Sequence, residues 1–194
     1  MNNVAIVLLA GGASTRLGRP KQLLSSGRKS LIQHVCDEAI ASEAGRVIVV
    51  TGAYHDEITN EIADKELELV RNEDWESGMA SSLKLGFQKA IEEDSISHVL
   101  LSVTDQPHLV KGVFQEIQKY AMTPQIVACK YGNGIVGVPA MFPREFANVI
   151  SELEGDQGAK VVVMKNLSSL VIVPFEKGNV DIDTPEDLKG LPLS

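Results

Sequence analysis

The chain has 194 residues, of which 44% are hydrophobic and 23% charged, a composition typical of an ordinary globular protein, and its length predicts a single domain over residues 1–194. The net charge of −8 disfavours nonspecific binding to nucleic acid, which needs a basic face, and no apolar run is long enough to span a membrane. The two cysteines, Cys36 and Cys129, form no CxxC pair, which indicates a reduced, cytoplasmic protein.

A buried strand followed by a glycine-rich loop is predicted near the start of the chain. Residues 4–10, VAIVLLA, form an apolar run without polar alternation, which is typical of a strand buried on both faces. The run ends at Gly11 and Gly12, which lack a Cβ atom and let backbone N–H groups come close to an anion. Arg16 and Lys21 add two cations to the same short loop. Together these residues indicate a loop that binds a triphosphate.

Two common phosphate-binding motifs do not account for this loop. A P-loop has four residues between its glycines and ends in Gly-Lys-Ser/Thr, whereas Gly12 and Gly18 are further apart and Arg19 follows. The dinucleotide-binding fingerprint does occur at residues 132–137, but it leads toward Pro139 rather than into a helix that could hold a pyrophosphate. For any single residue of the first loop, an ordinary strand–helix connection with surface cations remains the alternative.

Strands and helices alternate along the rest of the chain. In chain order, we predict a helix over residues 31–44, a strand over 46–51, a helix over 55–65, a strand over 67–71, a helix over 78–93, a strand over 98–103, a helix through 113–120, a strand over 125–131, a helix through 161–164 and a strand over 170–175. This alternation predicts an α/β fold, a three-layer α/β/α sandwich with a Rossmann-like, mostly parallel sheet.

Polar residues follow several of the predicted strands directly. Ligands bind at the carboxyl ends of the strands in an open parallel sheet. We therefore expect one crevice to collect four segments, residues 10–21, 51–52, 71–82 and 104–107. Asp105 is the best candidate for chemistry, because it follows a buried strand and Pro107 fixes the next turn. A helix cap or a plain turn is the alternative role for this aspartate.

A second acidic segment lies near the end of the sequence. Asp181 and Asp183 alternate with neighbouring residues, so both would point to the same side of an extended segment. Thr184, Pro185 and the acids after them have the pattern of a helix start. Capping is therefore the expected role of Thr184.

Six blocks of the sequence resemble one family. They are LAGGASTRLGRPKQLL at 9–24, WESGMASSL at 75–83, TDQP at 104–107, GVP at 137–139, GDQGA at 155–159 and DIDTPED at 181–187. In this order they resemble the MobA-like nucleotidyltransferases, and especially their molybdenum cofactor cytidylyltransferase branch. The resemblance extends from residue 4 to residue 188 and implies a fold of the nucleotide-diphospho-sugar transferase type.

The resemblance also implies roles for individual residues. Arg16, Lys21 and Asp105 would be catalytic, and Asp105 and Asp183 would hold Mg²⁺, which prefers oxygen ligands. Nucleotide binding is implied for Leu9, Ala10, Gly11, Gly12, Ser14, Arg16, Lys21, Thr51, Asn72, Gly78, Ser81 and Ser82. Acceptor binding is implied for Gly137, Pro139, Gly155, Asp156 and Gly158.

The implied reaction is transfer of CMP from CTP to the phosphate of molybdopterin, with release of pyrophosphate. The sequence shows no Ser-His-Asp or Cys-His constellation, so we expect direct in-line attack without a covalent intermediate. The expected partners are an NTP, a molybdopterin-type acceptor and a molybdenum hydroxylase that receives the product, with no nucleic acid and no membrane.

Two features of the sequence disagree about the base. Gly12 after Gly11 follows the guanylyl-transferring relatives, whereas residues 78–82 follow the cytidylyl pattern. We expect CTP with relaxed exclusion of GTP, because polar contacts to a base edge outweigh a methyl-sized steric difference. A guanylyltransferase, a sugar-phosphate nucleotidyltransferase and a noncatalytic carrier of molybdenum cofactor are the alternatives. A pure carrier would not need the triphosphate loop.

Overall fold

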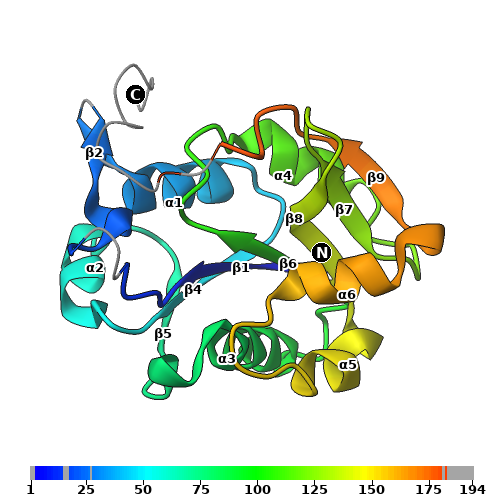
Figure 1. Cartoon of the computed structure of the whole chain (residues 1–194), viewed down its shortest axis with the longest axis horizontal. Coiled ribbons are helices and arrows are strands. Elements are labelled where there is room, and N and C mark those ends of the chain that lie inside the picture. Colours follow the sequence, from blue (N-terminus) through cyan, green and yellow to red (C-terminus); the bar gives the residue numbers. More distant parts are fainter. Residues whose placement is uncertain (1–2, 15–17, 27, 181, 183–194) are drawn as a thin grey trace.

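A seven-stranded sheet in the order β5-β4-β1-β6-β8-β7-β9 forms the centre of the molecule (Figure 1). The computed structural model describes residues 3–14, 18–26, 28–180 and 182. The strands of the sheet are β1 (Val4–Ala10), β4 (Arg46–Thr51), β5 (Glu68–Arg71), β6 (His98–Val103), β7 (Val127–Lys130), β8 (Val136–Pro143) and β9 (Val171–Pro174). Neighbouring strands are parallel except at β8, which runs antiparallel to β6 and β7. The mostly parallel sheet predicted from the sequence is confirmed.

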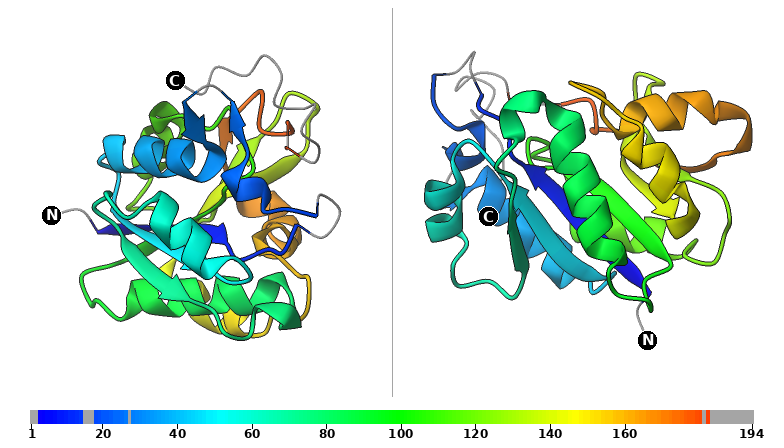
Figure 2. Two further views of the ribbon diagram at one scale, coloured as in Figure 1. Left: turned by 90° about the vertical axis from the view of Figure 1, so that its left-hand side faces the viewer. Right: turned by 90° about the horizontal axis from the view of Figure 1, so that it is seen from below.

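Helices cover both faces of this sheet (Figures 1 and 2). One face carries α1 (Leu31–Ala41), α2 (His55–Glu61) and α4 (Lys111–Gln118), and the other carries α3 (Met79–Ile91), α5 (Ala147–Ser151) and α6 (Ala159–Lys165). A small hairpin of β2 (Ser25–Ser26) and β3 (Lys29–Ser30) precedes α1. The short 3-10 turns are η1 (Lys21–Leu23), η2 (Trp75–Ser77), η3 (Arg144–Phe146) and η4 (Leu167–Ser169).

The alternation of side chains along β1 builds two separate cores. Ile6 and Leu8 pack in the cluster that includes α1 and α4, whereas Ala5 and Val7 pack in the cluster that includes α3 and α6. All four side chains are fully buried, because successive residues of a strand point to opposite faces and both faces are covered. The continuous apolar run near the start of the chain is thus a strand of the middle layer that is buried on both faces, as predicted.

Predicted strands match the structure more closely than predicted helices. The bounds of β4 and β6 are those expected, whereas α1 ends at Ala41 and α2 at Glu61, before the predicted residues 44 and 65. Glu43 adopts a left-handed backbone conformation with φ of 53°, and such a residue ends a helix.

The sequence did not predict β8, the strand that runs antiparallel to its neighbours in the seven-stranded sheet. Its sequence VGVPAMFP contains glycine and two prolines, which are depleted in central strands because proline cannot donate to the ladder. The structure accommodates Pro139 where the pairing of β7 with β8 shifts register, between Ala128 and Cys129. At such an irregularity a missing N–H donor costs little.

The order of the strands creates a crevice at the carboxyl end of β1. From β1 the chain adds β4 and β5 on one side, and then β6 on the other. The order of the strands therefore reverses at β1, and the carboxyl ends of the strands at such a switch point are where open α/β sheets bind ligands. None of the helices in the described part of the chain is long and apolar enough to cross a membrane.

Candidate active site

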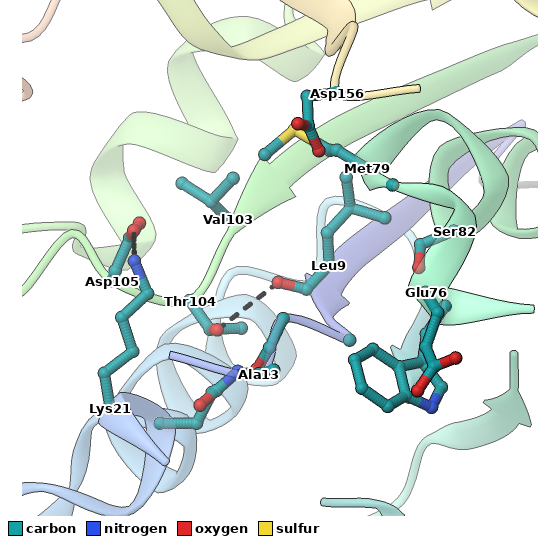
Figure 3. A pocket seen from close by; sticks show the side chains of 15 residues that line it. Leu9, Ala13, Lys21, Glu76, Met79, Ser82, Val103, Thr104, Asp105 and Asp156 are labelled. Atoms are coloured by element: carbon teal, nitrogen blue, oxygen red, sulfur yellow. Dashed lines mark hydrogen bonds and ion pairs between the residues drawn. The ribbon is translucent and has the colours of Figure 1, made fainter. Parts of the chain in front are cut away.

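A cavity of about 300 Å³ lies at the carboxyl ends of β1 and β6 (Figure 3). Its walls come from the glycine-rich loop, the end of β6, the start of α3 and the loop before α6. The lining residues are Leu9, Gly11, Gly12, Ala13, Lys21, Gln22, Trp75, Glu76, Gly78, Met79, Ser82, Val103, Thr104, Asp105 and Asp156. Three of the four segments that the sequence predicted to converge therefore line this cavity. The fourth, residues 51–52 at the end of β4, does not.

One end of the cavity is charged. Lys21 Nζ forms an ion pair with Asp105 Oδ2 (Figure 3), and the two side chains are 25% and 18% exposed. Thr104 Oγ1 donates a hydrogen bond of 3.3 Å to the carbonyl of Leu9, which ties the end of β6 to β1. Glu76 and Ser82 lie at the opposite end of the cavity (Figure 3). An elongated ligand could therefore place its anionic part at Lys21 and another part near Ser82.

The two carboxylate oxygens of Asp105 have different surroundings, since Oδ2 pairs with Lys21. Asp105 Oδ1 is buried and has no hydrogen-bond partner in the part of the chain that the structure describes. That same part holds no group of three or more His, Cys, Asp or Glu side chains placed to bind a metal. Mg²⁺ commonly takes only one or two protein carboxylates, with phosphates and water as its other ligands. The donor set fits such an ion.

Ile182, which directly precedes Asp183 in the sequence, contacts the backbone of Asp105. The N–H of Ile182 donates to the carbonyl of Asp105 at 3.2 Å, and the Ile182 side chain is fully buried. Gln106 Nε2 donates to the carbonyl of Gly178 at 2.7 Å, which holds the segment before Ile182 against the same turn. Asp183 and Arg16 lie outside the described residues.

A buried glutamine that the sequence analysis did not single out holds the glycine-rich loop. Gln22 is 2% exposed and lines the cavity. Its Nε2 donates to the carbonyls of Ala10 and Gly12, each at 3.1 Å. Ser14 Oγ accepts from the N–H of Lys21 at 3.1 Å, so Ser14 acts within the loop rather than as a lining residue. The only sequence signal for Gln22 is its position after Lys21.

The start of α3 touches the loop that was predicted to bind the acceptor. Gly78 has φ of 107°, a conformation that favours glycine, and a Cβ there would lie 2.4 Å from the carbonyl carbon of Gly155. The N–H of Ala80 donates to the carbonyl of Gly155 at 2.9 Å. This contact brings Asp156 to the cavity wall, whereas Gly155 and Gly158 do not line the cavity.

The predicted serines of α3 have different surroundings. Asn72 Nδ2 donates to Ser81 Oγ at 2.8 Å and to Ser82 Oγ at 2.9 Å. Ser82 lines the cavity, while Asn72 and Ser81 line a neighbouring groove on the other side of Gly78. Since Ser82 Oγ accepts from Asn72, its own proton is left to donate to another group.

Four further predicted residues do not reach the cavity wall. Thr51 is fully buried, with Oγ1 at 2.7 Å from His55 Nδ1 and donating to the carbonyl of Val70 at 3.3 Å. Ala10 is buried within β1, and Gly137 and Pro139 are buried within β8. The expectation that a strand end faces the crevice failed for Thr51, because its hydroxyl turns toward α2 and β5. Seven lining residues were absent from the predicted set: Ala13, Gln22, Trp75, Glu76, Met79, Val103 and Thr104.

The pKa of His108, in the turn after Asp105, is lowered from its ordinary value. Burial is the main cause, and Lys177 and His34 lower the pKa further. The charged form of this imidazole near Asp105 is therefore disfavoured.

Comparison with known proteins gives a consistent result. The family model described as "MobA-like NTP transferase domain" matches residues 6–170. The chain is 28% identical to a protein named nicotine blue oxidoreductase from Paenarthrobacter nicotinovorans, over 95% of this chain and 94% of that protein. It is also 28% identical to a probable molybdenum cofactor guanylyltransferase of Halalkalibacterium halodurans, over 94% of both chains. The crystal structure of Rv0371c from Mycobacterium tuberculosis H37Rv superposes with a TM-score of 0.86 at 27% identity, covering 99% of this chain and 98% of that chain.

Proposed function

The chain belongs to the MobA-like NTP transferase family, and from this membership we propose that it transfers a nucleotidyl group from an NTP to the phosphate of a molybdopterin-type acceptor. An oxygen of the acceptor phosphate would attack the α-phosphorus, the bond from that phosphorus to the β-phosphate oxygen would break, and pyrophosphate would leave. The observation that carries this proposal is the cavity in which Lys21, Asp105 and the glycine-rich loop meet.

Charge neutralisation and alignment are what this displacement needs most. We propose that Lys21, together with Arg16, holds the triphosphate, and that no covalent intermediate forms. The position of Lys21 Nζ beside Asp105 supports a role for both residues at the reacting phosphate. When substrate binds, Lys21 would exchange Asp105 for a phosphate, and Asp105 would exchange Lys21 for the metal ion. Ser82, at the other end of the cavity, would donate its proton to an acceptor atom of the base or ribose.

We propose that Asp105 and Asp183 hold Mg²⁺. The buried, unpartnered Oδ1 of Asp105 supports the first ligand. The hydrogen bond from Ile182 to the carbonyl of Asp105 supports the second, because Asp183 follows Ile182 directly in the chain. The chemistry that Mg²⁺ supplies when bound is neutralisation of the charge on the α-phosphate and the departing pyrophosphate.

CTP is the proposed nucleotide, on the strength of the cytidylyl-type residues 78–82 and the free proton of Ser82. GTP is the second candidate. An added Cβ at Gly12 would meet no described atom within 4 Å, which leaves room for a larger base. Three relatives are named as probable molybdenum cofactor guanylyltransferases.

For the acceptor, we propose the side of the cavity next to Asp156. The contact between Gly155 and the start of α3 supports this, because it joins the loop that carries Asp156 to the helix start proposed to contact the nucleotide. Gly137 and Pro139 would contribute only through the position of β8, since both are buried within that strand.

Pyrophosphate release tests the proposal directly. The protein is incubated with molybdopterin, Mg²⁺ and each of CTP, GTP, ATP and UTP in turn, and pyrophosphate and the nucleotide-extended pterin are measured. Release that requires both the acceptor and one preferred NTP is the expected result. Binding of molybdopterin without release of pyrophosphate from any NTP would overturn the proposal and indicate a carrier.

A further inference from the structure

Gln22 joins the two ends of the glycine-rich loop. It belongs to η1, directly after Lys21, and it is the most buried polar residue of this segment, at 2% exposed. Both carbonyls that its Nε2 reaches, those of Ala10 and Gly12, lie on the first arm of the loop. One side-chain amide therefore connects the end of β1 with the turn that carries Lys21.

This arrangement uses the full donor capacity of the amide. A glutamine Nε2 has two N–H groups, and here each has a backbone carbonyl at 3.1 Å. Because the carbonyl oxygens of Ala10 and Gly12 are directed at Gln22, they are not directed at a bound phosphate. A carbonyl oxygen that faced the phosphate would repel it through its partial negative charge. The amide thereby fixes the direction of two peptide groups that border the cavity.

A second contact closes the same loop. Ser14 Oγ accepts from the N–H of Lys21 at 3.1 Å and lies 3.5 Å from Gln22 Oε1. Ser14 adopts a left-handed backbone conformation with φ of 50°, which is costly for a residue with a side chain unless its surroundings hold it. The N–H of Lys21 is thus held by Ser14, which in turn contacts the Gln22 side chain.

We propose that Gln22 is a positioning residue of the triphosphate site. It holds the peptide groups of the glycine-rich loop and the backbone of Lys21 in the geometry that the phosphates require. This inference rests on the proposed nucleotidyl transfer, and it gives a role to a residue of the motif at 9–24 to which the sequence analysis assigned none. Gln22 acts through the loop, so its loss should affect the phosphates more than the acceptor.

A purely structural role for Gln22 predicts a different outcome, namely lower stability with unchanged ligand binding. Gln33 provides the matched control. It is a glutamine of α1 that also uses both ends of its amide, with Nε2 donating to the carbonyl of Glu61 at 3.1 Å and Oε1 accepting from the N–H of Ser30 at 3.1 Å. Gln33 does not line the cavity.

The experiment compares Gln22→Met with Gln33→Met. Pyrophosphate affinity is measured by calorimetry, KM and kcat are measured for NTP and acceptor, and thermal unfolding is recorded for each variant. A misplaced loop costs roughly a hundredfold in rate, so we expect Gln22→Met to weaken pyrophosphate binding and lower kcat/KM for NTP by that order. The KM for the acceptor should stay unchanged. Gln33→Met should lose stability and keep its affinity for pyrophosphate.

Gln22→Asn keeps an amide that is too short to reach both carbonyls, and it replaces Gln22→Met if that variant does not fold. Equal pyrophosphate affinity in the folded Gln22 variant and in Gln33→Met would overturn the positioning role while leaving the proposed function intact. Wild-type protein that binds neither pyrophosphate nor any NTP would overturn both the proposed function and this inference.

Discussion

Lys21 and Asp105 form an ion pair at one end of the candidate active site although 84 positions separate them in the chain. One residue belongs to η1 after the glycine-rich loop, and the other follows β6. In the proposed reaction both must change partners, Lys21 to a phosphate and Asp105 to a metal ion. Binding of nucleotide and binding of metal should therefore be linked, because each removes one partner from the ion pair.

Replacing Asp105 with Asn should abolish transfer and preserve the fold. The variant loses a metal ligand, and loss of several kcal/mol of transition-state stabilisation corresponds to on the order of a thousandfold in rate. Pyrophosphate release and thermal unfolding are measured in parallel. Asp37→Asn is the control, because Asp37 forms ion pairs with Lys29 and Lys65 away from the cavity. Normal turnover by Asp105→Asn, or its failure to fold, would show that the metal assignment is wrong.

Lys21→Met should bind Mn²⁺ more tightly than the wild type when no nucleotide is present. The substitution frees Asp105 from its competing cation, and a partly exposed pair of this kind is worth roughly tenfold in affinity. The same variant should bind NTP more weakly. Arg19→Met, which removes a positive charge from an exposed position in the same loop, controls for the change in net charge. Equal Mn²⁺ affinities in the two variants would contradict the linkage.

Gly12→Ala should sharpen the choice between CTP and GTP. The added methyl group meets no described atom within 4 Å, so it fits without moving the loop and narrows the space for a larger base. A methyl-sized difference is worth about 1–3 kcal/mol in discrimination. Competition of CTP with GTP in one reaction measures the ratio, and Gly112→Ala in α4, which also has open space around its Cβ, is the control. A clear preference of the wild type for GTP would refute the cytidylyl proposal.

Gly78→Ala should cost both stability and activity. Gly78 has φ of 107°, and its new Cβ would lie 2.4 Å from the carbonyl oxygen of Gly155. Backbone strain of this kind is worth about 1–3 kcal/mol before any clash is added. Gly155→Ala separates the two effects, because Gly155 also has a positive φ but open space around its Cβ. The larger loss of thermal stability and of affinity for NTP is expected in Gly78→Ala, and equal losses would exclude the contact as the cause.

The two cysteines should make the protein less stable at alkaline pH. Burial raises the pKa of the Cys36 thiol and of the Cys129 thiol from 9.0 to about 12. Below pH 9 both thiols are neutral whether the chain is folded or unfolded. Above it only the unfolded chain ionises, so stability falls as pH rises toward about 12. Denaturant unfolding at pH 8 and pH 10 measures this loss, which a Cys36→Ala, Cys129→Ala double variant should largely escape.

Local patterns in the sequence predicted the layers of the fold and most walls of the site. The central strand β1 was recognisable because a run without polar residues has to be covered on both faces. The glycine-rich loop was recognisable because glycines and cations after a strand suit an anion. Strand β8 was missed, because its glycine and prolines argue against a central strand unless the pairing partner shifts register.

The sequence by itself determined which groups are available to the site. These are two glycines and a lysine after the first strand, and an aspartate after a second strand. Only the tertiary structure decided which of them meet. It paired Lys21 with Asp105, turned the hydroxyl of Thr51 away from the cavity and gave Gln22 its two carbonyl partners. The physical reason is that propensity and burial patterns are properties of a few consecutive residues, whereas a side-chain contact depends on how distant segments are brought together by packing.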